Sequence, residues 1–182
     1  MSTVQVDAIN ESTTNAGVTV DGVLIKDSSI ASSYITGAGK VLQVVTAETT
    51  TSTTSTSTTY SDTTLTGSIT PSATSSKILV LIAQEYNFSA SNTTFIKAGI
   101  KVVRTIGATA TDIKETAGLT LNSGSGSAAQ FGGILPITIL DSPSTTSSVT
   151  YKTQQHKEAT DTSISTQSAS EKSTITLIEI GA

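Results

Sequence analysis

The residue with the widest chemical range is His156, the single histidine of a chain that also carries fourteen carboxylates. A Ser-His-Asp triad requires a serine in a strained Gly-x-Ser-x-Gly turn. The nearest match, Gly124-Ser125-Gly126-Ser127, has no apolar strand leading into it. We therefore expect His156, which lies in the polar stretch 151–158, to be an exposed loop residue rather than a catalytic base.

Metal and cofactor chemistry also lacks the residues that it needs. The carboxylates are dispersed, none forms a calcium loop, and the chain has no cysteine for zinc or iron–sulfur ligation. Gly37-Ala38-Gly39-Lys40 fails the phosphate-loop pattern, because the first glycine would fall at Tyr34 and Val41 follows the lysine. The sequence predicts no catalytic residue, metal ligand or cofactor. A glycan-degrading enzyme stays open only if distant carboxylates converge.

Charge and hydropathy exclude two kinds of partner. Ten Lys and Arg residues are scattered through a chain of formal net charge -4, so no basic stripe is available for a phosphate backbone. No stretch approaches the roughly 20 apolar residues of a spanning helix. The N-terminus has neither the cationic start nor the apolar core of a secretory signal. We expect no nucleic-acid or membrane partner, and synthesis in the cytoplasm without a signal peptide.

Glycan contact is the one binding chemistry that the residue types allow. Tyr86 could offer an aromatic platform, and Asn87, Asn92 and Asn122 could bond sugar hydroxyls. Core packing at the end of a strand explains Tyr86 equally well without a ligand. We favour packing and keep a glycan site as the alternative.

The elements that must position these residues are short strands. Of the nineteen residues from Thr46 to Thr64, only four are neither serine nor threonine. Threonine is β-branched and suits a half-exposed pleated strand, but it lacks acid–base range. This segment is therefore predicted to have a structural role rather than to form a functional site.

Apolar runs separated by turn residues predict further strands, and no window shows helical periodicity with caps. The predicted strands are 41–45, 65–69, 77–85, 95–106, 131–140, 149–155 and 173–180. We expect 77–85 to be central and buried on both faces, and Pro136 to mark an edge or a bulge. The last strand should direct Ile175, Leu177 and either Ile178 or Ile180 into the core. Residues 37–182 are thus predicted to form an all-β, antiparallel, jelly-roll-like sandwich.

Residues 1–36 form a separate N-terminal arm, joined to the sandwich by a glycine hinge. Asp21-Gly22 between two short apolar runs predicts a tight hairpin. A lone hairpin is marginal, because burying a few Val and Ile side chains contributes less than their ordering costs. The arm should therefore fold against copies of itself or a partner. Its docking and trimerisation residues are Val4, Val6, Ile9, Val18, Val20, Val23 and Ile25.

The order of these motifs resembles a known family. The stretch 6–11 followed by 17–27, Gly-Val-Thr-Val-Asp-Gly-Val-Leu-Ile-Lys-Asp, is similar to a module of tail fibres and other exterior proteins of tailed bacteriophages. The series at 41–44, 60–63, 69–71, 76–80 and 174–180 resembles a β-rich domain found beside that module. The resemblance implies a homotrimeric virion component with the arm as stem and the β domain displayed outward. It supplies no catalytic residue.

Two functions fit this resemblance. In the first, the trimer decorates or cements the capsid from the virion surface, docking its arm on the major capsid protein or another virion protein. The short segment before the module favours this compact knob. In the alternative, the trimer is a short tail fibre whose loops bind a host-surface polysaccharide.

Overall fold

The computed structural model describes residues 18–20, 23–26, 29–30, 39–90, 95–122, 128–158, 162–168 and 171–181. The chain forms two compact units, Met1–Ala38 and Gly39–Ala182. The sequence placed its boundary between residues 36 and 37. Gly39 opens the second unit with a φ of +100°, a left-handed conformation that favours glycine.

The first unit contains a hairpin that continues into a third strand. Strand β1 (Val18–Val20) pairs antiparallel with β2 (Val23–Lys26), and Val20 lies opposite Val23 across a two-residue connection. The predicted hairpin is confirmed. Strand β3 (Ser29–Ile30), which was not predicted, pairs with the other edge of β2.

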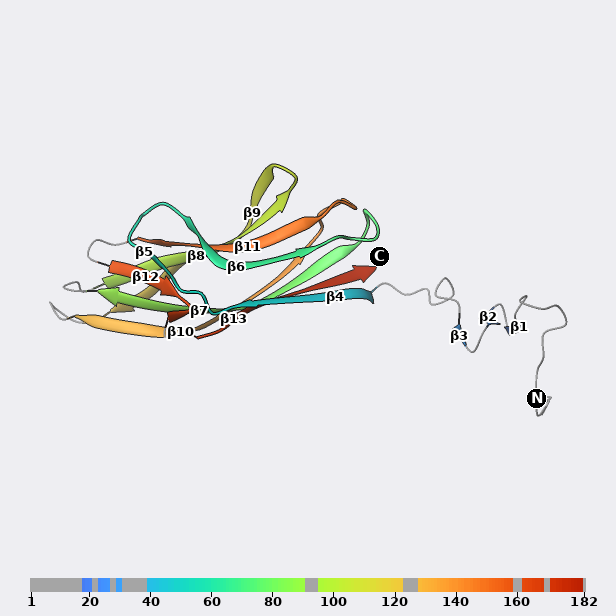
Figure 1. The fold of residues 1–182 in the computed structure, drawn as a ribbon, viewed down its shortest axis with the longest axis horizontal. Coiled ribbons are helices and arrows are strands. Elements are labelled where there is room, and N and C mark those ends of the chain that lie inside the picture. The colour runs from blue at the N-terminus through green and yellow to red at the C-terminus, as the bar shows by residue number, and fades with distance from the viewer. Residues whose placement is uncertain are drawn as a thin grey trace, which may run out of the picture. The chain divides into compact units, whose positions relative to one another are not determined.

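The second unit is a sandwich of two antiparallel sheets (Figure 1). In the larger sheet, the order is β4-β13-β7-β12-β5, and β10 pairs with the free side of β7. Its strands are β4 (Lys40–Thr49), β5 (Thr53–Ser55), β7 (Lys77–Ala90), β10 (Ala129–Asp141), β12 (Thr162–Thr166) and β13 (Ser173–Gly181). The smaller sheet, β6-β11-β8-β9, contains β6 (Ser61–Ile69), β8 (Phe95–Ile106), β9 (Thr109–Asn122) and β11 (Val149–Lys157). The all-β, antiparallel sandwich is confirmed.

Strand β7 is central, as predicted, but only one of its faces is fully buried. Ile78, Val80 and Ile82 enter the core, whereas the alternating residues Leu79 and Leu81 are half-buried on the outer face. The expectation of burial on both faces was wrong, because no layer of the described chain covers this sheet from outside. Pro136 does lie on an edge strand: β10 pairs with β7 alone among the described strands, and Pro136 is opposite Ala83.

The core is apolar along most of its length and polar in one band that joins the two sheets. The Thr63 hydroxyl of β6 lies 2.6 Å from that of Thr153 on β11, and Thr153 Oγ1 donates to Gln84 Oε1 on β7 at 2.7 Å. Gln84 Nε2 in turn donates to Ser173 Oγ on β13 at 3.0 Å. All four side chains are buried. We call this chain of hydrogen bonds the polar band.

Strand β13 corrects the predicted phase of the last apolar run. Ile175 and Leu177 are fully buried as expected, but the next inward residue is Glu179, so Ile178 and Ile180 face outward. Glu179 Oε1 accepts hydrogen bonds from the Ser72 amide (2.7 Å) and hydroxyl (2.6 Å), and Gln43 Nε2 donates to Oε2 at 2.6 Å. Burial opposes ionisation, yet these bonds outweigh it and hold the pKa of Glu179 at about 2.

Candidate functional site

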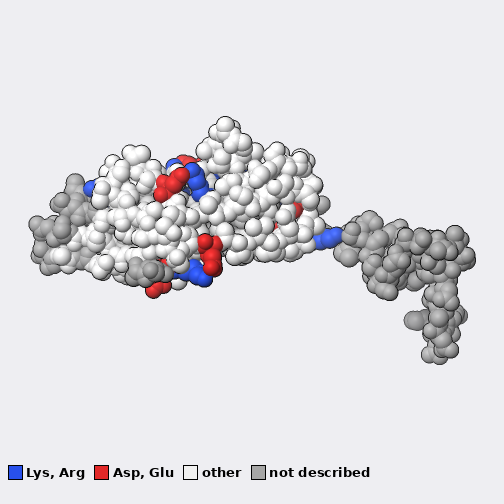
Figure 2. Space-filling model, in the orientation of Figure 1, with Lys and Arg blue, Asp and Glu red and all other residues white. Residues whose placement is uncertain are grey.

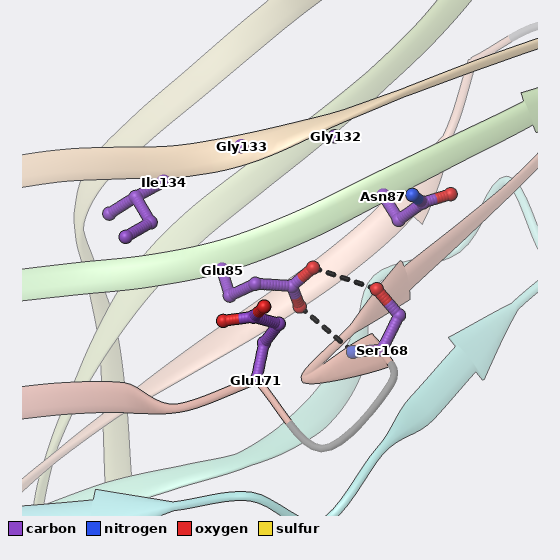
Figure 3. A pocket seen from close by; sticks show the side chains of 7 residues that line it. All are labelled: Glu85, Asn87, Gly132, Gly133, Ile134, Ser168 and Glu171. Atoms are coloured by element: carbon purple, nitrogen blue, oxygen red, sulfur yellow. Dashed lines mark hydrogen bonds between the residues drawn. The ribbon is translucent and has the colours of Figure 1, made fainter.

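A pocket of about 430 Å³ lies on the outer face of the larger sheet (Figure 3). Three elements line it. Glu85 and Asn87 come from β7, Gly132, Gly133 and Ile134 come from β10, and Ser168 and Glu171 come from the connection between β12 and β13.

The β12–β13 connection is attached to the sheet by Glu85. The Ser168 amide donates to Glu85 Oε2 at 2.9 Å, and the Ser168 hydroxyl donates to Oε1 at 2.7 Å, as Figure 3 shows. Glu85 is only 6% exposed although it faces outward from the sheet. Both carboxylate oxygens are therefore engaged in holding one wall of the pocket.

The floor on β10 is backbone, because Gly132 and Gly133 carry no side chain. A Cβ atom on Gly132 would lie 2.8 Å from Asn87 Nδ2, a separation that real Cβ contacts do not reach. Asn87 Oδ1 accepts a hydrogen bond from Gln130 Nε2 at 2.9 Å. The glycine thus keeps the Asn87 amide beside the floor of the pocket.

The lining can form hydrogen bonds. Asn87 and Glu171 supply polar groups, and Ile134, which is 61% exposed, adds an apolar wall. In the described part of the chain, no group of three or more His, Cys, Asp or Glu side chains could hold a metal ion. This arrangement suits a polar ligand bound by hydrogen bonds.

The other residues proposed for glycan contact do not join Asn87. Tyr86 points to the opposite face of β7, is 9% exposed, and packs on Phe88 with ring centroids 4.8 Å apart. The favoured packing interpretation of Tyr86 is therefore confirmed. Asn122 ends β9 in the other sheet, opposite Phe95, and Asn92 lies outside the described residues.

His156 is not an exposed loop residue. It lies in β11, its side chain is 13% exposed, and its ring stacks on Tyr60 with centroids 3.9 Å apart. His156 Nδ1 lies 3.2 Å from the Thr58 carbonyl oxygen, and Nε2 is 3.7 Å from Glu158 Oε1. The prediction failed because Gly99 on the neighbouring strand leaves room for the ring: a Cβ there would be 2.5 Å from Nε2.

Tyr60 completes this cluster on the smaller sheet. Its hydroxyl donates to Glu115 Oε1 at 2.8 Å, and Lys101 Nζ lies 4.4 Å from the centroid of its ring. Burial, followed by the hydrogen bond to Glu115, raises the pKa of Tyr60 above its ordinary value. The phenol therefore stays protonated and acts as a structural donor.

A second polar group joins the sheets near the end of β10. Arg104 Nη1 contacts both carboxylate oxygens of Asp141 at 2.9 and 3.1 Å, and the Tyr151 hydroxyl donates to Asp141 Oδ2 at 2.7 Å. Burial and this bond raise the pKa of Tyr151. The three side chains come from β8, β10 and β11, so they connect the two layers.

The predicted docking residues of the arm are only partly described. Val18 is paired with Ile25 and Val20 with Val23, so these four occupy opposite positions of the hairpin. Val4, Val6 and Ile9 lie outside the described residues.

Charged side chains form small groups on the second unit. On the face drawn in Figure 2, Lys, Arg, Asp and Glu gather in a few places and most of the described surface carries none. No helix in the described ranges is long and apolar enough to cross a membrane.

Sequence reasoning found Asn87 but missed the other residues that line the pocket. The Gly132-Gly133 pair inside a strand-like run was the available signal, since glycine in a strand often marks a close backbone approach. Glu85 and Ser168 gave no local signal, because they meet only through the pairing of β7 with β12.

No protein-family model matches the chain, and no curated protein matches it. Among solved structures, one of infectious bursal disease virus, Gt strain, aligns with 92% of this chain and 43% of its own at 15% identity, with a TM-score of 0.37. One of the Gx strain aligns with 80% and 38% at 13% identity, with a TM-score of 0.33. The chain spans less than half the length of either.

Proposed function

We propose that this chain is a non-catalytic structural protein of a tailed-phage virion, a homotrimer on the particle surface that decorates or cements the capsid. The observation that carries the proposal is the division into a small strand unit, Met1–Ala38, and a complete sandwich, Gly39–Ala182. The described strands of the first unit have only two to four residues each, and strands need a hydrophobic face or a packing partner to be stable in water. Sister copies and a capsid or other virion protein would act as that packing partner, in keeping with the resemblance of 6–11 and 17–27 to a module of tailed-phage exterior proteins.

The state of the reactive side chains supports a passive role. Glu179 is bound by Ser72 and Gln43, Glu85 is bound by Ser168, and His156 is stacked on Tyr60. Each of these groups performs a structural task that catalysis would interrupt. These contacts support the proposal of a protein without enzymatic activity or cofactor.

Copy number tests this proposal. Decoration of repeated shell positions requires tens to hundreds of chains per particle, which quantitative mass spectrometry of purified virions would measure against the major capsid protein. Only a few trimers per particle, or density confined to the tail in a map of the particle, would contradict decoration.

The pocket specifically favours a second function, a short tail fibre that binds host-surface polysaccharide. Its amide, carboxylate and glycine floor suit sugar hydroxyls. Purified trimer should then be retained by host polysaccharide, and both Asn87→Ala and Gly132→Ala should reduce retention at least tenfold. Thr111→Ala, an exposed change in the other sheet, is the control. Equal retention of all variants, or none by the parent, would contradict this function.

A further inference from the structure

The outer face of the larger sheet carries an apolar patch that the core does not require. Strand register places Leu140 opposite Leu79, Leu79 opposite Ile178, and Ile178 opposite Val44. Directly opposite residues lie on the same face of a sheet, so these four form one row across β10, β7, β13 and β4. Ile180 and Val41 extend the row toward Gly39. We call these six residues the apolar patch.

The patch is open to solvent at both edges of the sheet. Val41, Val44 and Leu140 are 57%, 56% and 55% exposed, while Leu79, Ile178 and Ile180 between them are half-buried. The row that contains Ile180 and Val41 also contains Lys77, opposite Ile180. Lys77 is the one charged residue among the described residues of this row and of the row from Leu140 to Val44. The adjacent row is mostly threonine, with Thr138, Thr176 and Thr46 around Leu81.

The alternation of side chains along β13 determines which of its residues face solvent. Glu179 occupies the inward position, where its three hydrogen bonds satisfy it, and thereby turns Ile178 and Ile180 outward. Contiguous apolar groups rimmed by polar residues usually mark an interaction site. The neighbouring threonines show that this face tolerates polar residues one row away.

The position of the apolar patch next to Gly39 indicates which partner would cover it. The Gly39 amide donates to the Gly181 carbonyl at 3.2 Å, and Val41 is opposite Ile180, so the patch begins where the sandwich joins residues 1–38 (Figure 1). If the N-terminal units of several copies associate, their patches are brought to high effective concentration near the same axis. The surface also suits an identical surface, because Lys77 is the one charged residue in its rows and repulsion between like charges would be small.

We infer that the apolar patch is the contact between sandwiches of neighbouring copies, an inference that rests on the proposed homotrimer. A stable interface buries about 800 Å² on each partner. Six side chains, three of them half-buried, provide only part of that area. The patch therefore acts together with the N-terminal units rather than alone.

Sedimentation of the full chain over a dilution series tests the inference. The double variant Val44→Asp with Leu140→Asp should raise the concentration at which the trimer dissociates at least tenfold, with the sandwich still folded by circular dichroism. Thr46→Asp with Thr138→Asp changes the same two strands one row away and should have a much smaller effect. The absence of native cysteine adds a second readout. In the assembled parent, a Val44→Cys thiol should react with a bulky maleimide at least tenfold more slowly than a Thr111→Cys thiol.

The outcomes separate the inference from the proposed function. A parent trimer that the double Asp variant leaves intact, with the Val44→Cys thiol as reactive as the Thr111→Cys thiol, would overturn the patch contact and leave the trimer standing. A parent that sediments as a monomer at every concentration would overturn both. Equal dissociation by the patch pair and the threonine pair would also overturn the patch, because it would show a general effect of charge on this face.

Discussion

At the scale of single residues, Glu179 links stability to pH. Its pKa is about 2 in the fold against an ordinary 4.5, so its stabilisation is complete above pH 4.5 and is lost as the pH falls from 4.5 toward 2. Glu179→Gln should lower the free energy of unfolding at pH 7 by on the order of 3 kcal/mol and flatten the acid dependence. Denaturant unfolding at pH 7, 4.5 and 3 measures both effects.

The matched control is Glu48→Gln. Glu48 contacts Lys172 Nζ at 2.9 Å on the surface, where both side chains are more than half exposed. Loss of such a pair costs about 0.5 kcal/mol or less. A Glu179→Gln variant that retains the acid slope of the parent would contradict the assignment.

Gly99 is predicted to be indispensable for the packing of His156. Gly99→Ala would place Cβ 2.5 Å from His156 Nε2 and 2.7 Å from the Tyr60 hydroxyl, so the stacked pair must move. We expect a loss of about 1–3 kcal/mol in the free energy of unfolding. We also expect a changed NMR signal of the single histidine. Gly133→Ala, whose Cβ would meet Tyr86 Oη at an ordinary 3.7 Å, should change neither quantity by a similar amount.

At the scale of elements, the polar band sets how the sheets face each other. Thr153→Val would remove the donor to Gln84 Oε1 and the partner of Thr63, leaving buried polar atoms unpaired. The expected loss is about 1–3 kcal/mol in the free energy of unfolding. Thr150→Val on the same strand removes only an exposed bond to Ser68, and should cost about 0.5 kcal/mol or less. Equal losses in chemical denaturation would argue against a special role for the band.

The apolar strands were predictable because their burial follows their hydrophobic pattern. Strands β4, β6, β7, β8, β10, β11 and β13 each contain a predicted run. The missed strands β5, β9 and β12 are rich in Thr, Ser and charged residues, which occur equally in loops. The edges of β5 and β12 are completed by neighbours far away in sequence, such as Ser165 beside Thr54, whereas β9 pairs with the adjacent β8. The pocket was unpredictable for the same reason, since Glu85 and Ser168 are joined by sheet order rather than by a local motif.

At the scale of the whole molecule, the two units should be separable. Removal of residues 1–38 leaves every described pairing of the sandwich intact, because all partners of β4 to β13 lie within Gly39–Ala182. We expect residues 39–182 to unfold cooperatively, with a thermal midpoint within a few degrees of the full chain, but to be monomeric in sedimentation. An unfolded fragment would contradict the independence of the sandwich. A trimer as stable as that of the full chain would show that the first unit is unnecessary for assembly.

The position of β13 between β4 and β7 has a consequence for synthesis on the ribosome. Strand β4 begins at Lys40, yet its ladder partner begins at Ser173, so β4 emerges more than a hundred residues before it can pair. During translation, the strand that contains Val41 and Val44 therefore stays unpaired. Its free backbone groups could pair wrongly with other nascent chains. The threonines that follow in β4 make this unpaired strand more polar. Pairing of β4 with β13, which closes this part of the sandwich, becomes one of the last events of folding.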